Sequence, residues 1–220
     1  MRPELPTGTV TFLFTDVEGS TRLLHTLGAA AYAESLAEHR LVLRAAFAAH
    51  GGVEVDTQGD AFFVAFSTAE GAAGAAREAN ERLASGRISV RMGLHTGAPT
   101  VTNEGYVGID VHRGARVAAL AHGSQIVLSP ATATLLEGHP LRDLGLHRLK
   151  DFEGATRLFQ LGEVEFPPRC AAPGVSSSPL RRPVSSDARA SSSKRSLSPT
   201  SATHACSRSS APAGRARPAS

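Results

Sequence analysis

A predicted β-hairpin at residues 53–66 limits the folds open to this chain. Residues 53–57 (VEVDT) alternate apolar and polar side chains as a strand does, and residues 61–66 (AFFVAF) form a second β-rich run. Between them, Gln58-Gly59-Asp60 suits a tight turn. Because a hairpin pairs two successive strands antiparallel, the chain cannot be a doubly wound fold of strictly alternating strands and helices.

The elements around this hairpin predict a ferredoxin-like sheet. A buried strand is expected at residues 9–15 (TVTFLFT), followed by a long helix that Ser20 or Thr21 could cap and that ends near Gly51-Gly52. An alanine-rich helix at 69–83 and a strand at 88–95 follow the hairpin. The order βαββαβ predicts an α+β fold with helices covering one face of the sheet.

The remaining segments predict additional α and β elements on that ferredoxin-like sheet. Residues 96–107 contain Gly, Pro and Asn and are expected to form a loop. The rest of the domain is expected to form a helix at 110–120, a strand at 125–129, a short helix at 130–136 and closing strands at 141–150 and 157–161.

Charge divides the chain into two unlike parts. Residues 1–166 carry 14 basic and 19 acidic side chains, whereas residues 167–220 carry 9 basic and 1 acidic. The second part holds no aromatic residue and is rich in Ser, Pro and Ala, a composition that cannot bury enough apolar surface to fold. We therefore predict an N-terminal extension at 1–6, a folded domain at 7–162 and a disordered basic tail at 163–220.

This division also limits the partners and the compartment. The positive charge belongs to the tail, so nucleic acid is not an expected partner of the folded domain. Both cysteines, Cys170 and Cys206, fall in the tail, which leaves the fold no disulfide and suits a reducing cytosol. With no signal peptide and no apolar run near the ~20 residues of a membrane span, the expected location is cytoplasmic.

Two carboxylates are candidates for holding metal. Asp16 follows the first predicted strand and Asp60 lies in the hairpin turn, and these strands can be neighbours in a ferredoxin-like sheet. Such oxygen ligands suit Mg²⁺ or Mn²⁺, and a pair of ions can support phosphoryl chemistry. The alternative is structural: Asp60 as a turn residue and Asp16 as a helix cap.

Anion-binding chemistry is predicted at two further places. The Gly-containing turn at residues 17–21 opens a helix, and backbone N–H groups and the helix dipole there favour phosphate. His112 and Arg116 are four residues apart and share one helix face, where a guanidinium suits the charge on a transferring phosphoryl group. The alternative for this pair is a solvated basic face.

Taken together, these segments resemble the class III adenylate/guanylate cyclase catalytic domain, in particular its actinobacterial type. The resemblance runs in order through residues 7–162. It is carried by residues 14–21 (FTDVEGST), 57–66 (TQGDAFFVAF), 93–97 (GLHTG), 111–116 (VHRGAR), 123–129 (GSQIVLS), 141–145 (LRDLG) and 148–151 (RLKD).

The resemblance implies a head-to-tail homodimer that shares its sites between protomers. Asp16 and Asp60 would hold two Mg²⁺ or Mn²⁺ ions with help from the Val17 carbonyl, and Arg116 of the other protomer would stabilise charge on the α-phosphate. The ribose 3′-hydroxyl of ATP or GTP would attack the α-phosphorus and release pyrophosphate. The implied phosphate-binding residues are Val17, Glu18, Gly19, Ser20, Thr21 and Lys150.

Three positions depart from the adenylate cyclase pattern. Asp56 stands where adenylate cyclases have a purine-reading lysine, Gly105 replaces its acidic or threonine partner, and His112 replaces a transition-state asparagine. Asp56 could accept hydrogen bonds from guanine, which leaves both ATP and GTP as candidate substrates. The leading hypothesis is a nucleotide cyclase. The alternative is a degenerate domain that binds nucleotide or a partner without turnover.

Overall fold

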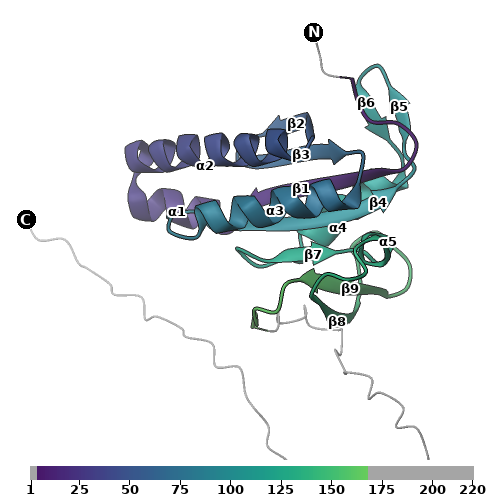
Figure 1. Cartoon of the computed structure of the whole chain (residues 1–220). Helices are drawn as coiled ribbons and strands as arrows, with labels where there is room; N and C mark the ends of the chain where they lie inside the picture. The colour runs from purple at the N-terminus through teal and green to yellow at the C-terminus, as the bar shows by residue number, and fades with distance from the viewer. Residues whose placement is uncertain (1–3, 168–220) are drawn as a thin grey trace, which may run out of the picture. The chain divides into compact units, whose positions relative to one another are not determined.

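Strand β1 (Val10–Val17) lies inside a seven-stranded sheet with the order β2-β3-β1-β4-β7-β9-β8 (Figure 1). The structure is a computed structural model and describes residues 4–167. The other strands of this sheet are β2 (Val53–Gln58), β3 (Ala61–Phe66), β4 (Val90–Gly97), β7 (Ile126–Leu128), β8 (Leu141–His147) and β9 (Thr156–Leu161). The helices are α1 (Ser20–Leu27), α2 (Ala29–Ala49), α3 (Ala69–Leu83), α4 (Ile109–Ala118) and α5 (Pro130–Leu135).

Strand pairing confirms the predicted α+β fold. Strands β2 and β3 form the expected hairpin, and β1 pairs antiparallel with both β3 and β4. Among the pairs of named strands within residues 4–167, only β4 and β7 run parallel. The first four strands and the helices between them make the ferredoxin-like unit, and β7 to β9 extend its sheet.

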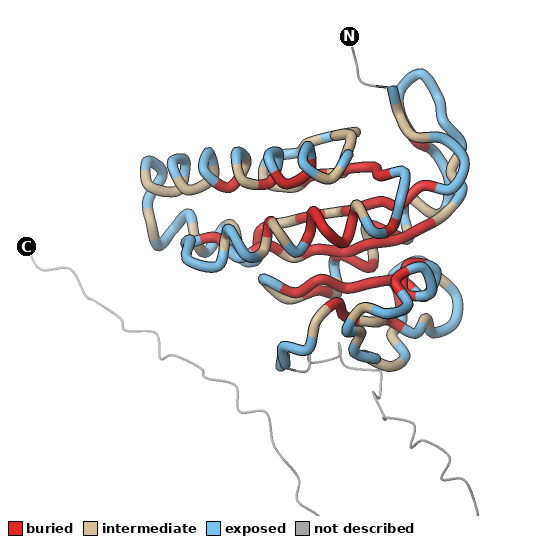
Figure 2. Tube along the Cα trace, in the orientation of Figure 1, coloured by how far each residue is buried: buried red, intermediate tan, exposed pale blue. Residues whose placement is uncertain are grey.

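Alternation along β1 separates the two faces of the sheet. Leu13 and Val17 point into the larger apolar core, which α2 and α3 complete, and Phe12 and Phe14 point to the opposite face. Figure 2 shows buried positions following the central strands and α3. The buried surface of α3 consists of alanine and glycine, which lets this helix approach the sheet closely.

Helix α4 packs on the opposite face, so the expectation that helices cover one face only is wrong. Two glycines make this approach possible. A Cβ added to Gly93 would lie 2.3 Å from the backbone nitrogen of Ala118, and one added to Gly114 would lie 2.6 Å from a ring carbon of Phe14. Larger side chains at either glycine would push α4 off the sheet.

Other elements differ locally from the expectation. The long helix from residue 20 to about 50 is broken into α1 and α2 at Gly28, whose φ of 77° and ψ of 163° are not helical. Neither Ser20 nor Thr21 is the cap: Gly19 is, with φ 65°. Glycine adopts that left-handed conformation without steric cost, so it displaces the expected hydroxyl cap.

The segment expected to be a loop at residues 96–107 contains a small hairpin of β5 (Thr100–Thr102) and β6 (Gly105–Val107). These strands are three residues long, too short for a periodicity to reveal. Beyond residue 167 the predicted tail lies outside the described residues. Within residues 4–167, no helix has the length and apolar character needed to cross a membrane.

Candidate functional site

The β1–β3 ladder brings Asp16 and Asp60 to the same end of the sheet. Its last pair joins Thr15 to Phe62, and the Phe62 backbone N–H also donates to the Thr15 hydroxyl at 3.3 Å. Asp16 follows Thr15 by one residue on β1, and Asp60 precedes Phe62 by two residues just before β3. Because β1 and β3 run antiparallel, these two positions lie at the same end of the ladder. The predicted convergence of these two carboxylates therefore follows from strand register.

Asp60 presents an unusual oxygen. Its Oδ2 is buried and accepts no hydrogen bond from any described residue. The turn that carries it is fixed from α2, because Arg40 Nη2 donates to the carbonyl oxygen of Gly59 at 2.6 Å. A buried carboxylate oxygen without a donor is costly unless a cation or another ligand completes it.

The pKa of Tyr32 is influenced by the charges of both aspartates. Burial raises the pKa of its phenol first, and the negative charges of Asp60 and Asp16 raise it further. Arg40 and a hydrogen bond with the Ser20 side chain act in the opposite direction. Both carboxylates therefore act electrostatically on one hydroxyl at this end of α2.

Arg91 is a site residue that the sequence did not single out. On β4 it lies directly opposite Asp16, and an ion pair joins Arg91 Nη2 to Asp16 Oδ2. The available signal was one arginine inside the predicted, mostly apolar strand at 88–95. Its meaning depends on the β1–β4 register, which a single sequence does not supply.

The predicted anion site lies at the start of α1. Gly19 is its N-cap, and no side chain caps the helix. The backbone N–H of Glu18 donates to the carbonyl oxygen of Ser89 at 2.9 Å, and this bond anchors the turn to the residues just before β4. The first N–H groups of α1, from Ser20 onward, thus lack a capping side chain and can serve an anion.

Arg116, the predicted transition-state residue, pairs with a different carboxylate. It is near the end of α4, and its Nη2 donates to Asp151 Oδ2 at 2.6 Å. Within residues 4–167 no hydrogen bond or ion pair joins Arg116 to Asp16 or Asp60. His112 on the same helix and Lys150 beside Asp151 are both exposed. Within one protomer the Arg116 guanidinium is thus paired with Asp151 and not with Asp16 or Asp60.

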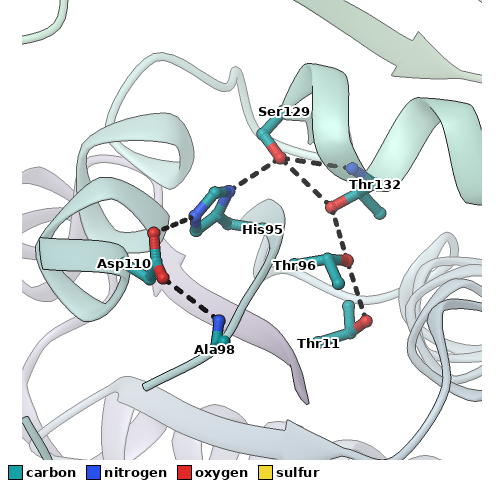
Figure 3. A network of polar contacts seen from close by, with 7 residues as sticks. All are labelled: Thr11, His95, Thr96, Ala98, Asp110, Ser129 and Thr132. Carbon is teal, nitrogen blue, oxygen red and sulfur yellow. Dashed lines mark hydrogen bonds and ion pairs between the residues drawn. The ribbon is translucent and has the colours of Figure 1, made fainter. Parts of the chain in front are cut away.

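A buried polar network fixes the start of α4 (Figure 3). Asp110 accepts from the backbone N–H of Ala98 at 3.2 Å and contacts His95 Nε2 at 3.1 Å. His95 Nδ1 contacts the Ser129 hydroxyl at 2.8 Å. The chain of hydroxyls continues from Ser129 through Thr132 and Thr96 to Thr11.

Burial lowers the pKa of His95, and the hydrogen bond and charge of Asp110 partly oppose this shift. Ser129 is fully buried, so this Ser-His-Asp chain has no access for a substrate. Its physical effect is to tie α4 to β4 and to the start of α5.

Asp56 and Gly105, the two predicted purine contacts, lie on neighbouring elements. Asp56 pairs with Phe63 and shares its sheet face, where Phe63 stacks on Phe14 at a centroid distance of 4.4 Å. Both Asp56 oxygens accept local hydrogen bonds, from the Thr57 backbone N–H at 2.8 Å and from the Gln58 side chain at 2.9 Å. The side chain nearest to Gly105 is that of Val55, 3.6 Å from where a Cβ would stand.

Comparison with known protein families identifies the family of this chain. The family model for the adenylate and guanylate cyclase catalytic domain matches residues 3–161. The chain belongs to this family. An uncharacterized protein of Mycobacterium tuberculosis is 39% identical over 163 residues, which cover 71% of this chain and 56% of that protein. The adenylate cyclase of Lachancea kluyveri is 33% identical over 162 residues, 59% of this chain and 9% of that enzyme. The chain thus spans about half the length of the first curated relatives it matches.

Solved cyclase domains share the fold. A Trypanosoma brucei adenylate cyclase in its monomeric state has a TM-score of 0.66 at 24% identity, covering 72% of this chain and 91% of that chain. The guanylate cyclase domain of Catenaria anguillulae RhGC, in complex with GTP, has a TM-score of 0.64 at 21% identity, covering 72% and 98%.

The donor set of this cyclase domain fits hard divalent cations. Both candidates are carboxylates, and Asp60 Oδ2 is an unsatisfied buried oxygen. Within residues 4–167 no group of three or more His, Cys, Asp and Glu could form a complete protein cage. Two carboxylates fit a site where substrate phosphates supply further ligands.

Proposed function

We propose that this cyclase domain converts ATP or GTP into a 3′,5′-cyclic nucleotide and pyrophosphate. The observation that carries the proposal is the unpartnered, buried Oδ2 of Asp60 at the same end of the sheet as Asp16, in a domain of the cyclase family. A turn residue or a helix cap would have used its oxygens on neighbouring N–H groups. An oxygen kept free of donors is instead available to a cation.

Asp16 and Asp60 would hold two Mg²⁺ or Mn²⁺ ions, with the Val17 carbonyl as a further oxygen. Such a pair of ions, when bound, would lower the barrier to in-line displacement at the α-phosphorus. Arg91 would then give up its ion pair with Asp16, because the cations compete for the same carboxylate. The ribose 3′-hydroxyl supplies the nucleophile and pyrophosphate is the leaving group.

The triphosphate would lie against the start of α1. Its β- and γ-phosphates would accept hydrogen bonds from backbone N–H groups within residues 17–21, apart from the N–H of Glu18, which donates to the Ser89 carbonyl oxygen. The uncapped N-terminus and the helix dipole favour that negative charge. Lys150 would add a further positive charge.

Arg116 would act from the second protomer of a head-to-tail homodimer. In one protomer it pairs with Asp151 and not with the groups around Asp16 and Asp60. A two-fold dimer can place α4 of one protomer over the aspartates of the other. The guanidinium would then stabilise charge on the α-phosphate, and His112 would donate a hydrogen bond nearby.

Asp56 would read the purine. It lies on the sheet face that also carries Phe14 and Asp16, as the alternation of β1 and the β2–β3 register require. Its carboxylate would accept hydrogen bonds from N1 and N2 of guanine, which favours GTP, whereas Gly105 contributes no side chain to select adenine. The exposure of Asp56 weakens this selection, so ATP remains a second substrate.

The test is to incubate the purified chain with ATP or GTP and Mn²⁺ and to measure cyclic product. Asp60→Asn keeps the size of the side chain but removes its charge and replaces one acceptor oxygen by an NH2 donor, so it should abolish turnover. Glu165→Gln, which breaks an exposed ion pair with Arg142 away from the site, is the matched control. Nucleotide binding without cyclic product in the wild-type chain would support the degenerate, regulatory alternative.

A further inference from the structure

The contact between Arg116 and Asp151 joins α4 to the turn between β8 and β9. The two residues are 35 positions apart, and Arg116 Nη2 lies 2.6 Å from Asp151 Oδ2. Each side chain is partly exposed, 36% for Arg116 and 59% for Asp151. Ion pairs with this exposure contribute little to folding stability, so a stabilising role does not account for the contact.

Asp151 occupies a backbone conformation that favours glycine. Its φ is 66°, and within residues 4–167 only Ser124 is another non-glycine residue with positive φ. Aspartate tolerates the left-handed region better than most residues but still less well than glycine. A carboxylate is therefore present at this position despite a conformational cost.

The turn itself is held rigidly against α4. Leu149 is buried in a small apolar cluster with Val117 of α4, and Phe152 packs against that cluster. The guanidinium of Arg113 lies over the Phe152 ring, 4.9 Å from its centroid. Because both sides of the contact are fixed, the Asp151 carboxylate defines one position for the Arg116 guanidinium.

The contact engages Arg116 through a single terminal nitrogen. Its Nε is buried and has no hydrogen-bond partner among the described residues. A bidentate pair would use two donors along one edge of the guanidinium, whereas this contact uses only Nη2 and leaves the donors of Nη1 for a ligand. The geometry thus orients the side chain without blocking it.

We propose that Asp151 is a positioning residue that orients Arg116 toward the substrate α-phosphate in the partner's site. The inference rests on the proposed cyclase function. Asp151 itself touches neither substrate nor metal in this scheme. Its effect is to restrict the guanidinium before the nucleotide binds, which lowers the entropy lost in reaching the transition state.

The kinetic test compares wild type, Asp151→Asn and Asp151→Gly as full chains. Both variants suit the positive φ, so both should fold; they remove the charge that orients Arg116. We expect kcat to fall roughly tenfold with KM changed less than twofold, because the contact matters in the transition state. Glu165→Gln, which removes another exposed carboxylate from an arginine, should leave kcat unchanged. Wild-type kcat in Asp151→Asn would overturn the proposal while leaving the cyclase function intact.

A second readout does not depend on turnover. In ¹⁵N-edited NMR spectra, restricted rotation should give Arg116 resolved guanidinium signals in the wild type, and Asp151→Asn should broaden or merge them. Arg116→Lys identifies those signals by removing them. If wild type makes no cyclic nucleotide, the proposed function fails separately, and the NMR comparison decides about Asp151. Identical Arg116 signals in wild type and Asp151→Asn would overturn its orienting role.

Discussion

Asp16 and Arg91 face each other across the β1–β4 ladder, and their side chains form an ion pair at the end of the sheet. The same carboxylate is the proposed ligand for a divalent cation. Under that proposal, Arg91 would compete with the cation for Asp16 and would also repel it through its own charge. This relationship makes metal affinity sensitive to a residue that is not a ligand.

Removing the charge of Arg91 should tighten Mn²⁺ binding in the absence of nucleotide. We expect Arg91→Gln to lower the dissociation constant for Mn²⁺ by roughly three- to tenfold, since a partly exposed pair interacts by about 1 kcal/mol. Titration followed by electron paramagnetic resonance measures this directly. Arg142→Gln is a matched control, because Arg142 pairs with Glu165 away from the aspartates. Equal or weaker Mn²⁺ binding by Arg91→Gln would contradict the competition.

The separation of Arg116 from the two aspartates predicts complementation between inactive variants. Asp16→Ala and Arg116→Ala should each be inactive alone. Mixing them should restore about a quarter of wild-type turnover, because half of the randomly formed dimers carry one intact site of two. The measurement is cyclic product after mixing, with heterodimers verified by differential tags. If heterodimers form and stay inactive, the shared site is wrong.

Asp56 should influence which purine is used. Asp56→Lys should shift the ratio of ATP to GTP turnover toward ATP by about tenfold, since one mismatched hydrogen bond costs about 1–3 kcal/mol and this position is exposed. Restoring the acidic partner with Gly105→Asp is unsuitable alone, because φ at Gly105 is 130°. Glu104→Lys makes the same charge change on the neighbouring turn and should leave the ratio as it is. An unchanged ratio in an active Asp56→Lys enzyme would show that Asp56 does not contact the base.

His39 should make the domain sensitive to acid. It is 1% exposed on α2, neither ring nitrogen has a hydrogen-bond partner among the described residues, and burial followed by the charge of Arg40 lowers its pKa to about 4. The unfolded chain therefore binds a proton near pH 6.5 that the folded chain binds only near pH 4. Stability from this group is complete above pH 6.5 and falls by about 3 kcal/mol as the pH drops from there to 4.

Urea unfolding at pH 7.5 and pH 5 tests this dependence. His39→Leu should be more stable than wild type at both values, because it also removes two unsatisfied buried nitrogens. It should lose less stability between them. His25→Leu, on the exposed side of α1, should keep the wild-type pH dependence. A pH dependence that survives His39→Leu would assign the effect to another group.

The hydroxyl groups of the polar network at the start of α4 should increase the free energy of unfolding. Ser129→Ala leaves His95 Nδ1 without its partner in a buried site and should lower the free energy of unfolding by about 1–3 kcal/mol. Thr134→Ala on the same short helix removes an exposed hydroxyl bond to Pro130 and should cost under about 0.5 kcal/mol. Thermal or urea unfolding compares the two. Equal losses would mean that the network carries no special stability.

The sequence by itself determined the elements whose signals are local. The Gln58-Gly59-Asp60 turn, the apolar strand before Asp16 and the pattern of the following helices suffice to predict the α+β sheet, because turn chemistry and hydrophobic periodicity act over a few residues. The same local order, together with the family resemblance, predicts that Asp16 and Asp60 share one site. The sequence did not predict the helix break at Gly28, because a single glycine inside an apolar helical pattern is often tolerated.

Only the tertiary structure decided the contacts that depend on register and packing. Arg91 meets Asp16 because β1 and β4 pair at one register among many, and no local pattern fixes that choice. Arg116 meets Asp151 because α4 and a turn 35 residues later pack through the same apolar cluster. Such contacts are set by the sum of many weak packing interactions across the whole domain, so they exist only once the chain has folded.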